Sequence, residues 1–393
     1  MTVFVAILGL LATLAVGPLD AQVRREGRYW VLTEQGVLPA GGRLRVHSIG
    51  SIDVQGEASS REVRYEVTKR VRVGGQQEAE QILQRARLTA ARQGNTASIS
   101  LESPECGRCG FSASMKISVP KSTLQAVLVT EGGSLNVIGI DGSVNAETAG
   151  GSVLMRQIGG AVSTTTAGGG IVLDAIGGNV HGETAGGSIQ LNAAGGDATL
   201  TTSGGGISVM RVKGTLRAET AGGNISAEQV GGNIVAGTSG GSIRLGEIGG
   251  SVRADTAGGS IHVTSAPAGV QAETAGGSIQ LKDVAGAVRA ANAAGSIRAE
   301  FLRGRPIRDS ILETNAGTIV VWLSESVPVT VDAVVDLAGS IRDIESEFSG
   351  VTVTRQDSGF GPATVVARGA ISGGGPVLRI RNVSGRIQIR RLP

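Results

Sequence analysis

The chain has 393 residues, of which 63 are glycine and only 2% are aromatic, so it lacks the large side chains that fill a wide globular core. Hydrophobic residues still make up 40%, which excludes the composition of a disordered chain. The 36 basic and 33 acidic residues are interspersed and leave a net charge of +3, so no dominant field exists to attract nucleic acid or an anionic membrane.

The N-terminus carries an apolar run over residues 3–16 that is too short for a membrane span, and Ala21 then supplies a small residue before Gln22. This pattern predicts a signal peptide over 1–21, export to the periplasm, outer surface or medium, and no membrane span after cleavage. No positive charge precedes the run, so two alternatives stay open, a misassigned start and an uncleaved anchor.

Residues 22–129 read as a β-rich cap that contains one helix, predicted over 76–93. Gly94 follows the helix, and strands at 63–73 and 111–119 flank it. One apolar stripe supports the helix: Ala79, Ile82, Leu83, Ala86 and Ala90. We expect this cap to cover the first coils of the region that follows.

Both cysteines lie in this cap, in the motif Cys106-Gly107-Arg108-Cys109. In an exported chain the spacing favours a local structural disulfide, with a redox or metal role as the alternative. A zinc site would need further ligands, and His47, His181 and His262 are far apart in sequence. No metal or other cofactor is therefore expected.

An 18-residue repeat organises residues 130–300. A threonine followed two residues later by Gly-Gly recurs at Thr130, Thr148, Thr166, Thr184, Thr202, Thr220, Thr238, Thr256 and Thr274. A second glycine doublet often follows nine residues after the first, which indicates two strands per repeat, and the doublets are expected to supply the positive φ of sharp turns.

The segments between the doublets alternate with a period of two, so apolar side chains share one facing. Equivalent positions form columns, such as Ile171, Ile189, Ile207, Ile225, Ile243, Ile261 and Ile279. This pattern predicts an all-β fold, a single-stranded parallel β-solenoid or β-roll with 18-residue coils. The nine-residue offset disfavours a three-sided hexapeptide helix, and calcium rolls would need a recurring Asp that is missing here.

Residues 301–393 are predicted to be an irregular solenoid and cap. Steps that resemble the repeat occur at Gly317-Thr318-Ile319 and Gly339-Ser340-Ile341, and strands are expected at 327–335, 351–354, 363–367 and 377–389.

Two features of the repeat could carry chemistry. A series of carboxylates beside the threonines, Glu147, Glu183, Glu219, Asp255 and Glu273, suggests glycan cleavage, but Thr165, Thr201 and Gly237 interrupt it and aromatic platforms are missing. Exposed threonines could order ice, but strand parity turns Thr256 inward, which favours an internal ladder of hydroxyls bonded to the backbone.

Five features occur together in this sequence: the export signal, the early Gly50-Ser51-Ile52-Asp53-Val54 step, the short helix, the strand end at Ile117-Ser118-Val119-Pro120, and the closing segment at 383–389. Together they resemble the bacterial putative-adhesin domain family, whose members are β-strand-repeat envelope proteins of unknown function. The resemblance implies a solenoid and an envelope location, and it transfers no binding residue.

The function predicted from the sequence is a structural or adhesive envelope module without enzymatic activity, whose flat faces bind a protein or polysaccharide surface ligand. The outward column Gln190, Ser208, Ser226, Arg244, His262 and Gln280 is a candidate for such a face. The alternative is a hydrolase or lyase that acts on glycans from a β-helix scaffold.

Overall fold

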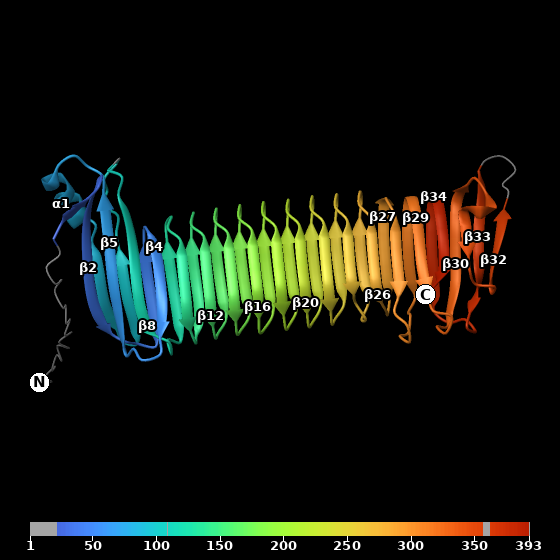
Figure 1. The fold of residues 1–393 in the computed structure, drawn as a ribbon, viewed down its shortest axis with the longest axis horizontal. Helices are drawn as coiled ribbons and strands as arrows, with labels where there is room; N and C mark the ends of the chain where they lie inside the picture. The colour runs from blue at the N-terminus through green and yellow to red at the C-terminus, as the bar shows by residue number, and fades with distance from the viewer. Residues whose placement is uncertain (1–21, 108, 357–361, 393) are drawn as a thin grey trace, which may run out of the picture. The chain divides into compact units, whose positions relative to one another are not determined.

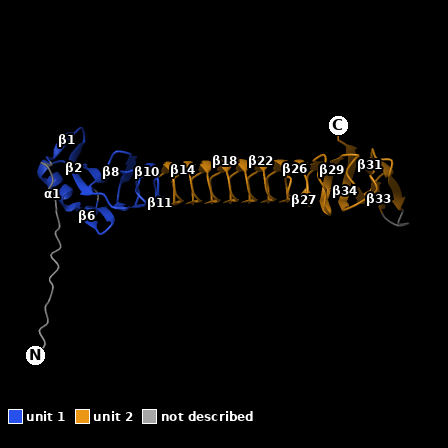
Figure 2. Ribbon diagram, turned by 90° about the horizontal axis from the view of Figure 1, so that it is seen from below, with its two compact units in different colours: residues 1–151 blue, residues 152–393 orange. Residues whose placement is uncertain are grey.

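The computed structural model describes residues 22–107, 109–356 and 362–392, and it divides the chain into two compact units, 1–151 and 152–393 (Figure 2). The predicted signal peptide over 1–21 lies outside the described residues. The all-β class is confirmed, with many regularly spaced and mostly parallel strands in the arrangement of a β-solenoid. The domain boundaries predicted at residues 129 and 300 separate segments with different repeat patterns. The two compact units are separated by their internal contacts and do not test those boundaries.

Unit 1 joins a set of antiparallel strands to the first parallel strands of the stack. Strands β2 and β5 pair antiparallel, and β5 also pairs with β8. The Gly50-Ser51-Ile52 motif lies at the start of strand β4, which pairs in parallel with β8 and β10. The strands are β1 (Arg24–Glu26), β2 (Tyr29–Pro39), β3 (Arg43–Ser48), β4 (Ser51–Glu57), β5 (Glu62–Val71), β6 (Leu88–Gln93), β7 (Thr96–Leu101), β8 (Ser112–Pro120), β9 (Gln125–Thr130), β10 (Leu135–Ile140) and β11 (Ser143–Thr148).

The helix of unit 1 is shorter than the sequence predicts. Helix α1 spans Gln76–Arg85, whereas residues 88–93 form β6, which pairs antiparallel with β7. Gly94, with φ of +58°, makes the turn of this hairpin and does not end the helix. The prediction of a helix to residue 93 was wrong because Leu88 and Ala90 also fit the period of a strand, and pairing with β7 decides between the two periods.

The repeats of unit 2 stack strand on strand in register (Figure 1). Ile171 pairs with Ile189 and Val252 pairs with Val270, so paired residues lie 18 positions apart. The even sheet consists of β12 (Val153–Ile158), β14 (Ile171–Ile176), β16 (Ile189–Ala194), β18 (Ile207–Val212), β20 (Ile225–Val230), β22 (Ile243–Ile248), β24 (Ile261–Ser265), β26 (Ile279–Val284) and β28 (Ile297–Phe301). The odd sheet consists of β13 (Val162–Thr166), β15 (Val180–Thr184), β17 (Ala198–Thr202), β19 (Leu216–Thr220), β21 (Ile234–Thr238), β23 (Val252–Thr256), β25 (Val270–Thr274) and β27 (Val288–Ala294).

The predicted facing of the side chains holds along these strands. Ile243, Leu245 and Ala254 are buried, whereas Arg244 and Arg253 on the same strands are exposed. The columns of isoleucine and leucine therefore form a thin core between the even and odd sheets, built from aliphatic side chains of consecutive coils.

The glycine doublets act differently from the sequence prediction. Among the described residues, none of the doublets from Gly186-Gly187 to Gly276-Gly277 has a positive φ. The second residue of each doublet must be glycine because the backbones of neighbouring turns lie very close together. A Cβ on Gly259, for example, would lie 1.9 Å from the carbonyl oxygen of Gly241 in the coil before it. The turns of successive coils stack backbone on backbone, which leaves no room for a methyl group.

The C-terminal part of unit 2 closes both sheets with long strands. Strand β29 pairs with β27 through its first half and with β28 through its second half, and β34 then pairs with β29 along its length. The elements are β29 (Ser310–Leu323), β30 (Val329–Ala338), the 3₁₀ turn η1 (Ile341–Asp343), β31 (Ile344–Ser346), β32 (Val351–Gln356), β33 (Ala363–Ile371) and β34 (Val377–Arg391).

The predicted repeat-like step at Gly339-Ser340-Ile341 is wrong. Ser340 caps η1, and the Asp343 side chain accepts from the Ser340 amide at 2.9 Å, so this capping box makes a helical turn and not a turn of the repeat. The coil after β29 is instead completed by β34, whose Ile387 pairs with Ile319 from 68 residues earlier in the chain.

Candidate binding faces

The threonine column lies inside the coils. Thr184, Thr202, Thr256 and the other repeat threonines that the structure describes are buried, between 1% and 7% exposed. The Thr256 hydroxyl donates to the Gly241 carbonyl at 2.8 Å and accepts from the Gly259 amide at 3.2 Å. The same pair of bonds holds in full at Thr148, Thr184, Thr202, Thr220, Thr238 and Thr274. These threonines bond to the turns and present no hydroxyl array to a ligand.

Outward side chains form rows because equivalent residues pair from coil to coil. On the even sheet one such row runs from Gln190 to Gln280. Within it Arg244 pairs with His262, and His262 pairs with Gln280 on the next strand. A second row at the edge of this sheet is linked by side-chain bonds, Arg211 to Gln229 at 3.1 Å and Gln229 to Glu247 at 3.4 Å. This row adjoins a groove of about 700 Å³.

The odd sheet presents a charged face. Arg253 Nε lies 2.9 Å from Asp255 Oδ2, and Arg217 makes the equivalent ion pair with Glu219 two coils earlier. The Glu273 carboxylate accepts from Gln271 at 2.9 Å and lies 3.9 Å from Arg289. Charged residues thus recur along this face with interruptions, such as Val235 and Gly237, and each of these carboxylates faces a partner on its own or a neighbouring strand.

A shallow groove of about 910 Å³ follows the corner between this face and the turns. Its carboxylates are those of Glu219, Asp255, Glu273 and Glu313. Small residues that occupy equivalent turn positions complete the lining, Ser239, Ala257, Ala275 and Ala293. The groove therefore repeats a small residue at one turn position over several coils. The adjacent strand position carries carboxylates but is interrupted by Gly237 and Ala291. An extended ligand could lie along this groove.

The cysteine pair and the histidines lie apart from one another in the described part of the chain. Cys106 and Cys109 have Cα atoms 5.6 Å apart, within the range that a disulfide spans. Cys109 packs with Leu32, Val71 and the buried face of α1. His181 lies 4.0 Å from Glu183, and no group of three or more potential metal ligands occurs among the described residues.

Two polar sites in the folded chain have no signal in the repeat pattern. In unit 1, Lys69 is 2% exposed, and its Nζ lies 2.5 Å from Glu34 Oε2 and donates to the Ala86 carbonyl at 2.6 Å. Burial, together with the Glu34 carboxylate, raises the pKa of the nearby Tyr65 phenol. The alternation of β5 places position 69 inward, which could have identified a buried lysine, but its partners come from distant segments.

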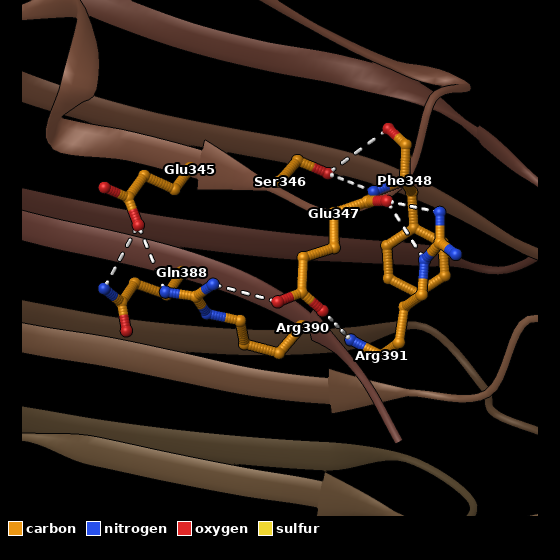
Figure 3. A network of polar contacts seen from close by, with 7 residues as sticks. All are labelled: Glu345, Ser346, Glu347, Phe348, Gln388, Arg390 and Arg391. Atoms are coloured by element: carbon orange, nitrogen blue, oxygen red, sulfur yellow. Dashed lines mark hydrogen bonds and ion pairs between the residues drawn. The ribbon is translucent and has the colours of Figure 1, made fainter. Parts of the chain in front are cut away.

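The second site is a glutamate–arginine clamp of Glu345, Glu347, Arg390 and Arg391 at the end of unit 2 (Figure 3). Arg390 donates to Glu347 at 2.9 Å and to Glu345 at 3.2 Å, and the Arg391 side chain donates to the Glu347 carbonyl. The Arg391 amide and the Arg390 guanidinium, which both donate to Glu347, hold the pKa of its carboxyl below its usual range.

A related pair of contacts joins β30, β33 and β34. Asp332 accepts from Arg381 at 2.7 Å and from Arg368 at 3.1 Å. Burial raises the pKa of Asp332, but the hydrogen bonds from these two arginines outweigh burial, so the net pKa lies below the usual value.

In the described part of the chain, no helix is long and apolar enough to cross a membrane. No family model matches the sequence, and no curated protein matches it.

Two solved structures resemble the chain. One is described as a putative adhesin from Bacteroides fragilis NCTC 9343; it is 12% identical with a TM-score of 0.20, and the match covers 92% of this chain and 97% of that one. The other is described as a putative cell adhesion protein from Clostridium sporogenes ATCC 15579; it is 7% identical with a TM-score of 0.18, over 92% of this chain and 100% of that one. Both descriptions name the kind of protein that the sequence resembles.

Proposed function

We propose that the chain is an exported, non-enzymatic β-solenoid, in which each 18-residue repeat forms one coil, and that it acts as a structural or adhesive module of the cell envelope. In this proposal the odd sheet binds an extended surface ligand, a protein segment or a polysaccharide. The observation that carries the proposal is the groove of about 910 Å³, which repeats a small turn position from coil to coil and is lined by the carboxylates of Glu219, Asp255, Glu273 and Glu313. Repeated weak contacts along a polymer add up to useful avidity.

The geometry gives the glycan-cleaving alternative little support. Asp255 and Glu273 face Arg253 and Gln271 within hydrogen-bond distance, and no aromatic side chain among the described residues lines the groove beside them to serve as a sugar platform.

The test uses the purified mature chain and a panel of immobilised envelope polysaccharides. We expect saturable binding to at least one polysaccharide or to intact cells, without release of reducing ends. An Ala257→Tyr variant fills the groove and should lose that binding, whereas Gln280→Tyr on the even sheet should keep it. Released reducing ends, or equal binding by both variants, would contradict the proposal.

We also propose that Cys106 and Cys109 form a structural disulfide. A loop this short restrains little of the unfolded chain, so removing it should cost on the order of 2 kcal/mol or less. A Cys106→Ser, Cys109→Ser variant should therefore fold and bind like the parent, measured by circular dichroism and the same binding assay. Loss of binding with an intact fold would favour the redox or metal alternative.

A further inference from the structure

The C-terminal part of unit 2 ends in two strands that differ in how their edges are protected. Strand β31 has three residues, pairs with β34 and is held by the glutamate–arginine clamp. Strand β32 has six residues and pairs with β33, and no other described strand pairs with it. Short strands and fixed charges are devices that block edge-to-edge association. Strand β31 has both, whereas β32 is longer and carries a single charged side chain, Arg355.

The sequence of β32 suits further pairing. Val351 to Gln356 contain no proline, glycine or lysine, and their register with β33 runs without a bulge from Val351 opposite Gly369 to Gln356 opposite Thr364. Val351 is buried and Val353 is half-buried, while Thr352 and Thr354 are exposed. Alternate N–H and C=O groups of an edge strand point away from its one partner, so β32 is a template for another strand.

We propose that β32 is an interaction surface, and that its occupant is β32 of a second copy of this chain in antiparallel pairing across a two-fold axis. Centred on Val353, this register sets Thr352 opposite Thr354 of the second copy and Val351 opposite Arg355. Thr–Thr pairs and β-branched pairs are favourable across strands, and no like charges are opposed. The strand is self-complementary, as a two-fold interface requires.

The consequence goes beyond the proposed function. An interface of six residues on each side is small, which predicts weak and reversible association. Two copies joined in this way form one bivalent particle, so a repetitive surface would be bound with greater avidity than by a single chain.

The experiment is sedimentation velocity on the mature full-length chain across a concentration series. The wild type should shift from one to two chain masses. A Thr352→Glu, Thr354→Glu variant places like charges opposite each other in the dimer, while within one chain the new carboxylate at position 352 faces Arg368 on β33. Its dissociation constant should rise about tenfold or more. A Thr352→Glu, Thr354→Lys variant pairs Glu with Lys across the two-fold axis and should restore the dimer.

The control is Gln280→Glu on β26, which pairs with a strand on each side and should leave association unchanged. Thermal melts in circular dichroism verify that each variant folds. A wild type that stays monomeric, masses that grow beyond two chains, or a Glu–Lys variant no better than the Glu–Glu variant would overturn the proposal. None of these outcomes depends on ligand binding, so the proposal can fail while the proposed function stands.

Discussion

The regular coils of unit 2 and its C-terminal part bury the same kinds of aliphatic side chain but hold their strands together differently. In the coils, one buried threonine per repeat bonds two turns, and glycines let those turns touch. In the C-terminal part, charged contacts join strands far apart in sequence, such as Asp332 with Arg381 and Glu347 with Arg390.

The difference follows from repetition. A coil that meets a copy of itself places each charge opposite an equivalent residue, so a charge repeated at one position would face its own kind from coil to coil. Neutral hydroxyls and close backbone contacts avoid this problem inside the coils. On the outer face Asp255 does lie opposite Glu273, and each is bonded by a neighbouring side chain. The end strands meet different sequences, so opposite charges can pair there. We therefore expect the coils to be sensitive to the volume of a single methyl group and the end to be sensitive to pH.

The largest effect should come from the closest backbone contact. Gly259→Ala places a Cβ 1.9 Å from the Gly241 carbonyl oxygen, and neighbouring coils on both sides prevent relief. We expect a loss of about 3 kcal/mol or more in the free energy of unfolding. The matched control is Gly258→Ala, whose Cβ would lie 3.6 Å from the nearest atom and should be tolerated. Equal melting temperatures for the two variants would refute the close-approach explanation.

A smaller effect is expected from the hydroxyl ladder. Thr256→Val keeps the side-chain shape but leaves the Gly241 carbonyl and the Gly259 amide without the hydroxyl. The expected cost is about 1–2 kcal/mol, measured by chemical denaturation. Thr264→Val, at an outward position of β24, should change stability by no more than about 0.5 kcal/mol. A Thr256 variant as stable as its control would mean that the ladder contributes nothing.

The smallest effect concerns the glutamate–arginine clamp and is local. The folded-state pKa of Glu347 lies below the ordinary value of 4.5, so the clamp stabilises the fold above that value and weakens as pH falls through the folded-state pKa. Glu347→Gln should therefore speed hydrogen exchange in β31 at neutral pH, and the difference from wild type should vanish in acid. Glu228→Gln in the regular coils serves as the control. A difference that persists in acid would point to packing and not to charge.

The structure of the repeated segment could be predicted from the sequence, whereas little of the non-repeated segments could. The isoleucine columns and the inward threonines followed from a spacing that recurs many times, so chance agreement at one position mattered little. The extent of α1 was misjudged because residues 88–93 fit two periods, and β7, which decides between them, lies beyond a turn. The role of the doublets was misjudged because a sequence does not show which backbone atoms meet.

The clamp and the buried Lys69 could not be predicted for a related reason. Glu345 and Arg390 are 45 residues apart, and their contact depends on β34 crossing back to pair with β29 and β31. No local pattern in residues 301–393 specifies that crossing. The exposed edge of β32 likewise becomes visible only when every strand's partners are known.

The central claim is that 18 residues make one coil, and paired deletions test it most directly. Deleting residues 239–256 joins Thr238 to Ala257, restores a Thr-Ala-Gly-Gly turn and keeps every column in register, so the variant should melt close to the parent. Deleting residues 239–247 removes half a coil and sets an odd strand where an even strand belongs, so cooperative melting should be lost or fall sharply. Circular dichroism melts of both variants decide the question. If the nine-residue deletion melts like the parent while the 18-residue deletion unfolds, the two-strand coil is contradicted.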